Sequence, residues 1–240
     1  MPSSLNDDQH PLAERFRSFI RDSAFSCIGA KSALAKGQLR VIVARDIRSA
    51  WDDLRILPEL LDLVQNYRAD PLLFQSFVVL FEQPEQLDEH EFEEHLWDRM
   101  QSLSDKDDWM GKGYDARVSP NPADPHFSLS FGGEAFFVVG LHPGASRIAR
   151  RFERPALVFN LHDQFERLRE QGLYDRLRMT ILERDLNLNG TQNPMLSRFG
   201  ENSEARQYSG RAVGSDWRCP FSPRQAGVQA QPISGDVEDA

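Results

Sequence analysis

Cysteine is scarce in this chain, with only Cys27 and Cys219 among its 240 residues. Two isolated thiols cannot form a pair of CxxC motifs, and no HExxH occurs, so the common zinc sites are excluded. The sequence also lacks a Walker-type phosphate loop and a GxSxG nucleophile elbow. These absences argue against a P-loop nucleotide-binding protein and against a serine hydrolase of the GxSxG type.

Long hydrophobic runs are also missing. None approaches the roughly 20 residues that span a bilayer, so no membrane span is expected. The N-terminal stretch MPSSLNDDQH is polar and acidic, unlike a secretory signal or an Arg-rich transit peptide. We therefore expect a cytoplasmic protein whose cysteines stay reduced. The formal net charge is −9, and an acidic surface repels phosphate backbones, which argues against nucleic-acid binding.

The composition, 40% hydrophobic and 27% charged, is that of a globular domain. Apolar runs bounded by turn residues alternate with amphipathic stretches, which predicts one α/β domain. Its sheet of about four or five strands would be covered by helices, and an α+β arrangement also fits. We expect a flexible N-terminus over 1–10, one domain over 11–222 and a disordered tail over 223–240.

The predicted elements follow apolar periodicity and capping signals. Pro58 is a candidate helix break, and the Gly/Pro/Asp-rich stretch 105–125 is expected to be a loop. The Gly pair in FGGEAF is best explained by a hairpin turn. The strands are predicted over 39–44, 72–81, 135–141 and 156–161, and the helices over 11–24, 28–36, 49–67, 88–103, 162–171 and 173–186.

Two apolar runs, AFFVVGL and ALVFNL, each end in a histidine, His142 and His162. Between them lies a basic cluster that includes Arg147, Arg150 and Arg151. Imidazoles at the ends of buried strands suit an iron ligand, and planar guanidinium groups pair with carboxylates in bidentate fashion. This combination indicates a heme pocket. The alternative is that both histidines are structural and that the arginines form a solvated helix face.

Cys27 follows Phe25 and Ser26 at the predicted start of a helix. A helix N-terminus favours the thiolate and lowers the thiol pKa, which makes Cys27 a rival iron ligand. A small buried hydrophobe is the alternative reading. The polar segment NPMLSRFGENSEARQYSGR, residues 193–211, is rich in side chains that line polar pockets, although a surface coil explains it as well.

These segments carry a family resemblance. FGGEAFFVVGLHPGASRIARRF, PALVFNLHDQFERLR, NPMLSRFGENSEARQYSGR and DWRCPF closely resemble the YqcI/YcgG family, and FSCIGAKSALAKGQLRV with DIRSAWDDL resembles its N-terminal part. The matching segments run from about Phe25 to Phe221. Ser26 and Ala135 stand where the family usually has proline, so the backbone near Cys27 is expected to be less rigid.

The resemblance implies a heme-dependent oxygenase that N-hydroxylates the guanidine group of arginine or an arginine-derived molecule, as in D-cycloserine and guanitoxin biosynthesis. Heme b would be the cofactor, O2 the co-substrate, and an external donor or reductase would supply electrons. The expected iron ligand is His142, then His162, then Cys27. The roles expected for the remaining residues are propionate binding by Arg147, Arg150 and Arg151, catalysis by His162, Gln207 and Tyr208, and substrate binding by Glu134, Glu201, Glu204 and Arg206.

Two other functions account for the same sequence features. A non-catalytic heme or gas-binding protein would use the same pocket. A metal-free interaction domain would instead have two structural histidines and would use the acidic helix over 88–103 as its contact surface.

Overall fold

The computed structural model describes residues 7–223, and a five-stranded mixed sheet forms its centre. The strand order is β1-β2-β5-β4-β3; β1 and β2 are parallel, and the other neighbours are antiparallel. The predicted α/β class is therefore confirmed. The strands are β1 (Leu39–Asp46), β2 (Ser76–Gln83), β3 (Leu129–Phe131), β4 (Glu134–Leu141) and β5 (Ala156–Leu161).

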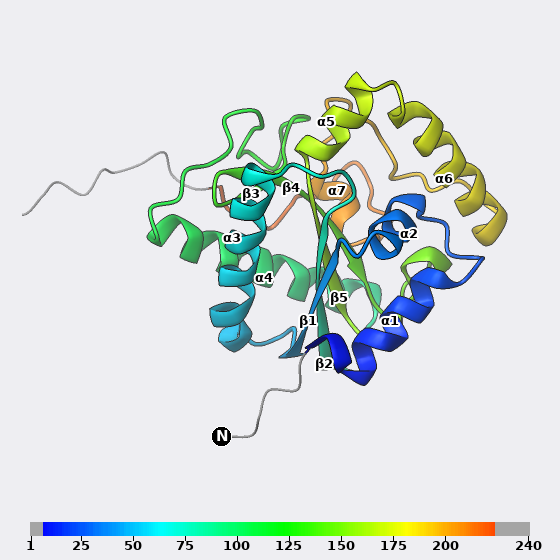
Figure 1. Ribbon diagram of the computed structural model, residues 1–240, viewed down its shortest axis with the longest axis horizontal. Coiled ribbons are helices and arrows are strands. Elements are labelled where there is room, and N and C mark those ends of the chain that lie inside the picture. Colours follow the sequence, from blue (N-terminus) through cyan, green and yellow to red (C-terminus); the bar gives the residue numbers. More distant parts are fainter. Residues whose placement is uncertain (1–6, 224–240) are drawn as a thin grey trace, which may run out of the picture.

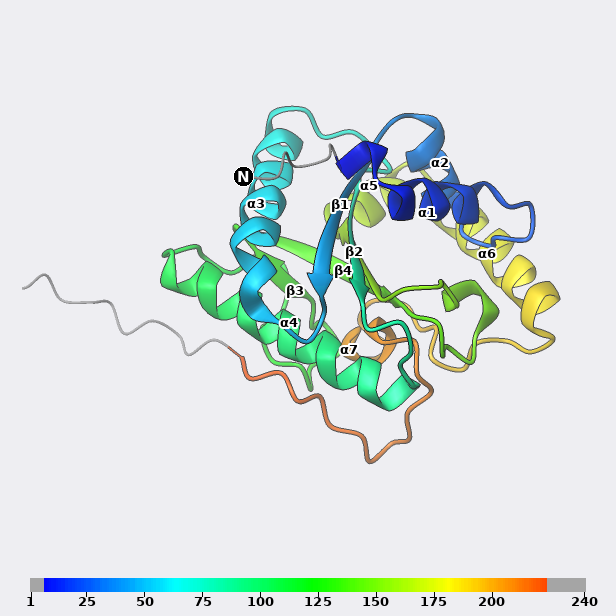
Figure 2. The ribbon, with the colours of Figure 1, turned by 90° about the horizontal axis from the view of Figure 1, so that it is seen from below.

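Helices cover both faces of the sheet (Figures 1 and 2). One face carries α3 (Asp53–Ala69) and α4 (Glu89–Trp109), and the short α7 (Ala205–Tyr208) packs against β4. The helices on the opposite face are α1 (Pro11–Arg21), α2 (Ile28–Ala35), α5 (Asp163–Glu170) and α6 (Tyr174–Asn189).

Strand alternation assigns the side chains of β4 and β5 to two separate cores. Phe136, Val138 and Phe159 pack with the buried residues of α3 and α4. Val139 and Val158 pack in a second cluster with residues of α1. Successive residues on these strands therefore face different compartments, and this alternation decides which polar residues come together.

Local sequence signals explain where several elements begin. Asp88 accepts hydrogen bonds from the backbone N–H groups of His90 and Glu91, and the Glu91 carboxylate accepts the Asp88 N–H. This capping box starts α4. Gly132 and Gly133 join β3 to β4 at φ values of +60° and +80°, which glycine adopts without strain. The predicted hairpin is confirmed.

Several predicted boundaries are wrong. The strand predicted from residue 72 begins at Ser76, because a turn with Phe74 at φ +71° precedes it. Helix α4 continues to Trp109, which shortens the predicted loop. Helix α3 runs through Pro58 without a break. Leu54, four residues earlier, is exposed, so water can reach the carbonyl that proline leaves without a partner.

The stretch expected to be flexible is partly ordered. Asp7–Gln9 form a 3-10 turn, and the Asp7 carboxylate accepts the backbone N–H of Val43 at 3.2 Å. Residues 1–6 of the predicted flexible N-terminus, and the predicted tail apart from residue 223, lie outside the described residues.

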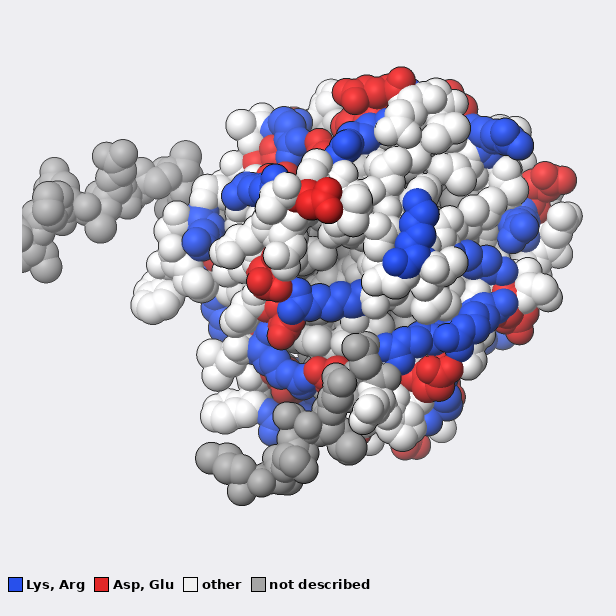
Figure 3. Space-filling model, in the orientation of Figure 1, with Lys and Arg blue, Asp and Glu red and all other residues white. Residues whose placement is uncertain are grey.

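Basic and acidic groups are interspersed over the face of the molecule in Figure 3. Within residues 7–223, no helix has the length and apolar composition needed to cross a bilayer.

Candidate functional site

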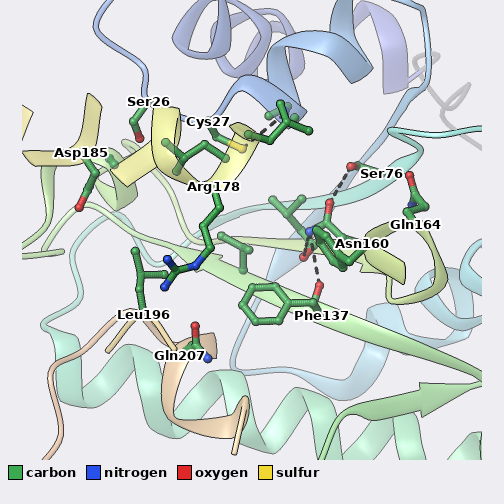
Figure 4. Close-up of a pocket in the computed structure, with 18 of the residues that line it drawn as sticks. Ser26, Cys27, Ser76, Phe137, Asn160, Gln164, Arg178, Asp185, Leu196 and Gln207 are labelled. Atoms are coloured by element: carbon green, nitrogen blue, oxygen red, sulfur yellow. Dashed lines mark hydrogen bonds between the residues drawn. The ribbon is translucent and has the colours of Figure 1, made fainter. Parts of the chain in front are cut away.

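A cavity of about 340 Å³ lies on the α1/α2/α5/α6 side of the sheet. Its floor includes Phe137 and Val139 of β4 and Val158 of β5. Val139 and Val158 belong to the cluster that strand alternation turns away from α3 and α4. The volume lies within the range of small-molecule sites, which are typically apolar with a few polar groups. We take this cavity as the candidate functional site (Figure 4).

One face of α6 forms a wall of the cavity. Tyr174, Leu177, Arg178, Ile181 and Asp185 all line it. Each lies three or four residues from another member of the set, which places them on the same side of the helix. Leu177 and Ile181 are only half-buried although they face inward. They border open space and do not pack into a closed core.

Cys27 contributes a thiol to the cavity from the start of α2. It is the N-cap residue, and its sulfur accepts the Ala30 N–H at 3.5 Å. Burial raises the pKa of this thiol, and its effect outweighs the lowering by backbone hydrogen bonds and by Arg150. The predicted lowering of the Cys27 pKa is wrong because desolvation outweighs the helix N-terminus.

His162 and Glu204 form a buried imidazole–carboxylate pair in the cavity wall. The His162 Nε2 lies 3.5 Å from Glu204 Oε1, and its Nδ1 lies 3.9 Å from a Glu166 oxygen. The Tyr208 hydroxyl donates to the second Glu204 oxygen at 3.3 Å. This arrangement holds the Glu204 carboxylate and orients the imidazole ring.

His142 does not line the cavity. It lies on the opposite side of the sheet, fully buried and stacked on Phe92 of α4 at a ring distance of 4.3 Å. Because β4 and β5 are antiparallel, their carboxyl ends lie at opposite ends of the sheet. The backbone N–H of His162 donates to the carbonyl of Ala135, which lies seven residues before His142. With a strand rise of about 3.3 Å per residue, the two histidines are therefore roughly 20 Å apart. The expectation that both line one pocket is wrong.

The basic cluster is divided by the fold. Arg147 and Arg150 line the cavity, whereas Arg151 holds its own loop through the carbonyls of Ala145 and Ser146. Arg147 pairs with Asp185. Arg150 donates to three backbone carbonyls, and burial lowers its pKa to about 10. Both arginines that this cluster contributes to the cavity thus already have protein partners.

Of the predicted carboxylates, only Glu204 reaches the cavity. Glu134 instead pairs with Arg68 and Arg117 near the start of β4. Glu201 is exposed and accepts the backbone N–H of Arg198. The predicted substrate-binding roles of Glu134 and Glu201 have no support in this geometry, because neither residue lines the cavity.

The segment 193–211 is likewise divided. Gln207 lines the cavity and donates to the Ser197 hydroxyl at 3.2 Å. Tyr208 is buried outside the cavity lining, and Arg206 bonds the carbonyls of Val213 and Gly214. Among the predicted catalytic residues, the cavity therefore brings together His162 and Gln207.

Several lining residues were not among the predicted site residues. Asn160 faces the cavity from β5, and its side-chain oxygen accepts the Ser76 hydroxyl at 2.7 Å (Figure 4). Arg178 extends into the cavity from α6. The signals were present in the sequence: a single amide within the apolar run ALVFNL, and an arginine beside the Leu177/Ile181 stripe.

The fold and cavity define an α/β protein with a small-molecule-sized site. A family model for the YqcI/YcgG family matches residues 16–222, and the chain belongs to that family. It is also 28% identical over 211 residues to the uncharacterized protein YcgG of Bacillus subtilis (strain 168), a match that covers 82% of this chain and 81% of YcgG. No solved structure gives a significant match.

The cavity has the donor types that a heme group requires. A heme iron needs one axial side chain, for which imidazole and thiolate are both established ligands. His162 and Cys27 line the same cavity, whose other walls are largely apolar. The residues present therefore fit a porphyrin by their chemistry, and the choice of ligand lies between these two side chains.

Proposed function

We propose that this protein is a heme-dependent oxygenase that N-hydroxylates the guanidine group of arginine or an arginine-derived small molecule. The observation that carries the proposal is one largely apolar cavity containing two candidate iron ligands and a buried carboxylate, His162, Cys27 and Glu204. Heme b would be the cofactor and O2 the co-substrate. The free thiols of Cys27 and Cys219 suit the reducing cytoplasm in which we place the reaction.

Bound heme would supply the O2 chemistry that amino-acid side chains lack. Hydroxylation of one guanidine N–H inserts one oxygen atom, and the other leaves as water after two electrons and two protons have been delivered. The electrons come from an external donor or reductase. The task of this chain is to bind the guanidinium, exclude water and hold the reacting nitrogen in place.

Glu204 is the carboxylate that supports guanidinium binding. It is 5% exposed, and the Tyr208 hydroxyl fixes one of its oxygens. A guanidinium group pairs with a carboxylate through parallel N–H···O bonds, which fixes its plane as well as its position. Gln207 and Asn160 add amide groups to the wall that can orient the substrate.

His162 has one of two roles, depending on the iron ligand. If Cys27 held the iron, the imidazole would remain available to pass a proton between its Nε2 and the Glu204 carboxylate. These two groups lie 3.5 Å apart, measured from Nε2 to Glu204 Oε1. If His162 held the iron through its other ring nitrogen, Glu204 beside Nε2 would increase the basicity of the ring. A thiolate ligand would require iron to overcome the raised pKa of the buried Cys27 thiol.

The test is an absorption spectrum of the reduced, carbon-monoxide-bound protein after expression with ample heme. Wild type is compared with His162→Ala and Cys27→Ala, and His142→Ala is the matched control outside the cavity. We expect a Soret band in wild type and in the control, and a shifted or lost band in one cavity variant. A wild-type protein without a Soret band refutes the cofactor proposal.

Activity is then measured by mass spectrometry of arginine incubated with the heme-loaded protein, reductant and air. We expect an N-hydroxylated product, and a large loss of it in Glu204→Gln. Heme binding without product or substrate-dependent oxygen consumption would instead favour a non-catalytic heme or gas-binding protein. Absence of bound heme from wild type and from every histidine and cysteine variant would favour a metal-free interaction domain.

A further inference from the structure

The charge of the cavity is opposite in sign to that of the whole chain. Among the described residues, four arginines but only two carboxylates line the cavity, Arg147, Arg150, Arg169 and Arg178 against Asp185 and Glu204. The whole chain nevertheless has a net charge of −9. A cavity with excess positive charge inside an acidic protein favours a ligand that brings negative charge.

Three of these arginines are already engaged within the protein. Arg147 pairs with Asp185, and Arg150 donates to backbone carbonyls. Arg169 pairs with Glu166 on its own helix. Each of these guanidinium groups is held by a protein partner, so it is less available to a ligand than a guanidinium without one.

Arg178 differs from them. It is half-buried on the inner face of α6, and its guanidinium extends into the cavity towards Leu196 and Gln207 (Figure 4). Within residues 7–223, no hydrogen-bond or ion-pair partner is found for it. The apolar side chains of Leu177 and Ile181 line the cavity from the same helix.

We infer that Arg178 binds a carboxylate group of the ligand that occupies this cavity. A planar guanidinium forms two parallel bonds to a carboxylate, and apolar surroundings strengthen that pair. The identity of the ligand rests on the proposed function, which offers two possible sources of the carboxylate group. One is a propionate of the heme, and the other is the α-carboxylate of an arginine-like substrate.

Two pairs of probes distinguish these sources. Hemin is compared with hemin dimethyl ester by Soret titration, and arginine is compared with agmatine, its decarboxylated analogue, by calorimetry. The variants are Arg178→Ala and the charge-conserving Arg178→Lys. Arg176→Ala is the matched control, because it removes the same charge from the exposed side of α6.

We expect Arg178→Ala to weaken binding of one carboxylate-bearing probe by about 10- to 100-fold, as is usual for loss of a charge-assisted hydrogen-bonded pair. Binding of the partner probe without that carboxylate should not change. A loss confined to hemin assigns the propionate, and a loss confined to arginine assigns the substrate carboxylate. Arg178→Lys should recover part of the affinity, and Arg176→Ala should match wild type.

The outcomes separate this inference from the proposed function. Wild-type hemin binding with no effect of Arg178→Ala on either carboxylate probe overturns the inference and leaves the cofactor proposal intact. Absence of hemin binding, with arginine still preferred over agmatine through Arg178, overturns the cofactor proposal alone. The inference is also overturned if wild type binds hemin and its dimethyl ester with equal affinity and binds arginine and agmatine with equal affinity.

Discussion

Acid sensitivity should originate in part from His142. Its side chain is 1% exposed and stacked on Phe92. Burial is the main reason that its pKa falls from 6.5 to about 4; Arg150 lowers it further, whereas Glu89, Asp88 and the Leu87 backbone carbonyl act in the opposite direction. The native state therefore holds His142 neutral at pH values where an unfolded chain has protonated it.

The sign and size of the effect follow from proton linkage. Because the pKa is lower in the native state, the unfolded state binds the proton first as the pH falls below 6.5. The free energy of unfolding then decreases by about 1.4 kcal/mol per pH unit until the native pKa near 4 is reached. The loss from this one group is about 2 kcal/mol at pH 5 and about 3 kcal/mol in full.

The assay is urea unfolding at pH 7 and pH 5 for wild type, His142→Gln and His90→Gln. His142→Gln removes the buried titrating group, so it should lose about 2 kcal/mol less than wild type between the two pH values. His90 is exposed on α4, and its variant should follow wild type. Equal losses in wild type and His142→Gln would refute the assignment of a low native pKa to His142.

Two further substitutions test the packing on the α3/α4 side of the sheet. Gly140→Ala would place Cβ 2.5 Å from Cε1 of Phe92, so we expect about 1–3 kcal/mol of destabilisation in urea unfolding, whereas Gly113→Ala, with open space around it, should cost far less. Asp53→Asn leaves buried Arg99 without its carboxylate partner at 3.0 Å, and the expected cost is about 3–5 kcal/mol, measured as a lower melting temperature. An Asp53→Asn melting temperature equal to wild type would show that Arg99 finds another partner.

Strong local patterns made much of the fold predictable. The apolar runs of β4 and β5 and the Gly132–Gly133 turn were identified correctly, because buried strands and positive-φ turns restrict residue choice. Pro58 was misread because its effect on α3 depends on whether water reaches the preceding turn. The extension of α4 beyond residue 103 was missed because the Asp-rich sequence resembles a loop, although Asp107 is buried and accepts the Gly132 N–H.

The site was only partly predictable because residue type alone does not specify a face of the sheet. His162 follows Asn160 by two residues and shares its side, so alternation along β5 places both at the cavity. His142 has the same relation to Gly140, which packs against Phe92 on the opposite side. Arg178 escaped prediction because the inward face of its helix has polar residues as well as Leu177 and Ile181, so this short apolar stripe did not single out one arginine.

Strand direction also determines where the two histidines lie, and the segment between β4 and β5 indicates that direction. A parallel return would need a crossover, usually through a full helix. The intervening residues 142–155 begin with HPGAS, and the structure has only the 3-10 turn Ile148–Arg150 there. With no helix to carry the chain back, β5 must run antiparallel to β4, and histidines placed after both strands must lie at opposite ends of the sheet. A single pocket in this fold can therefore contain either histidine but not both, and the cavity is lined by His162.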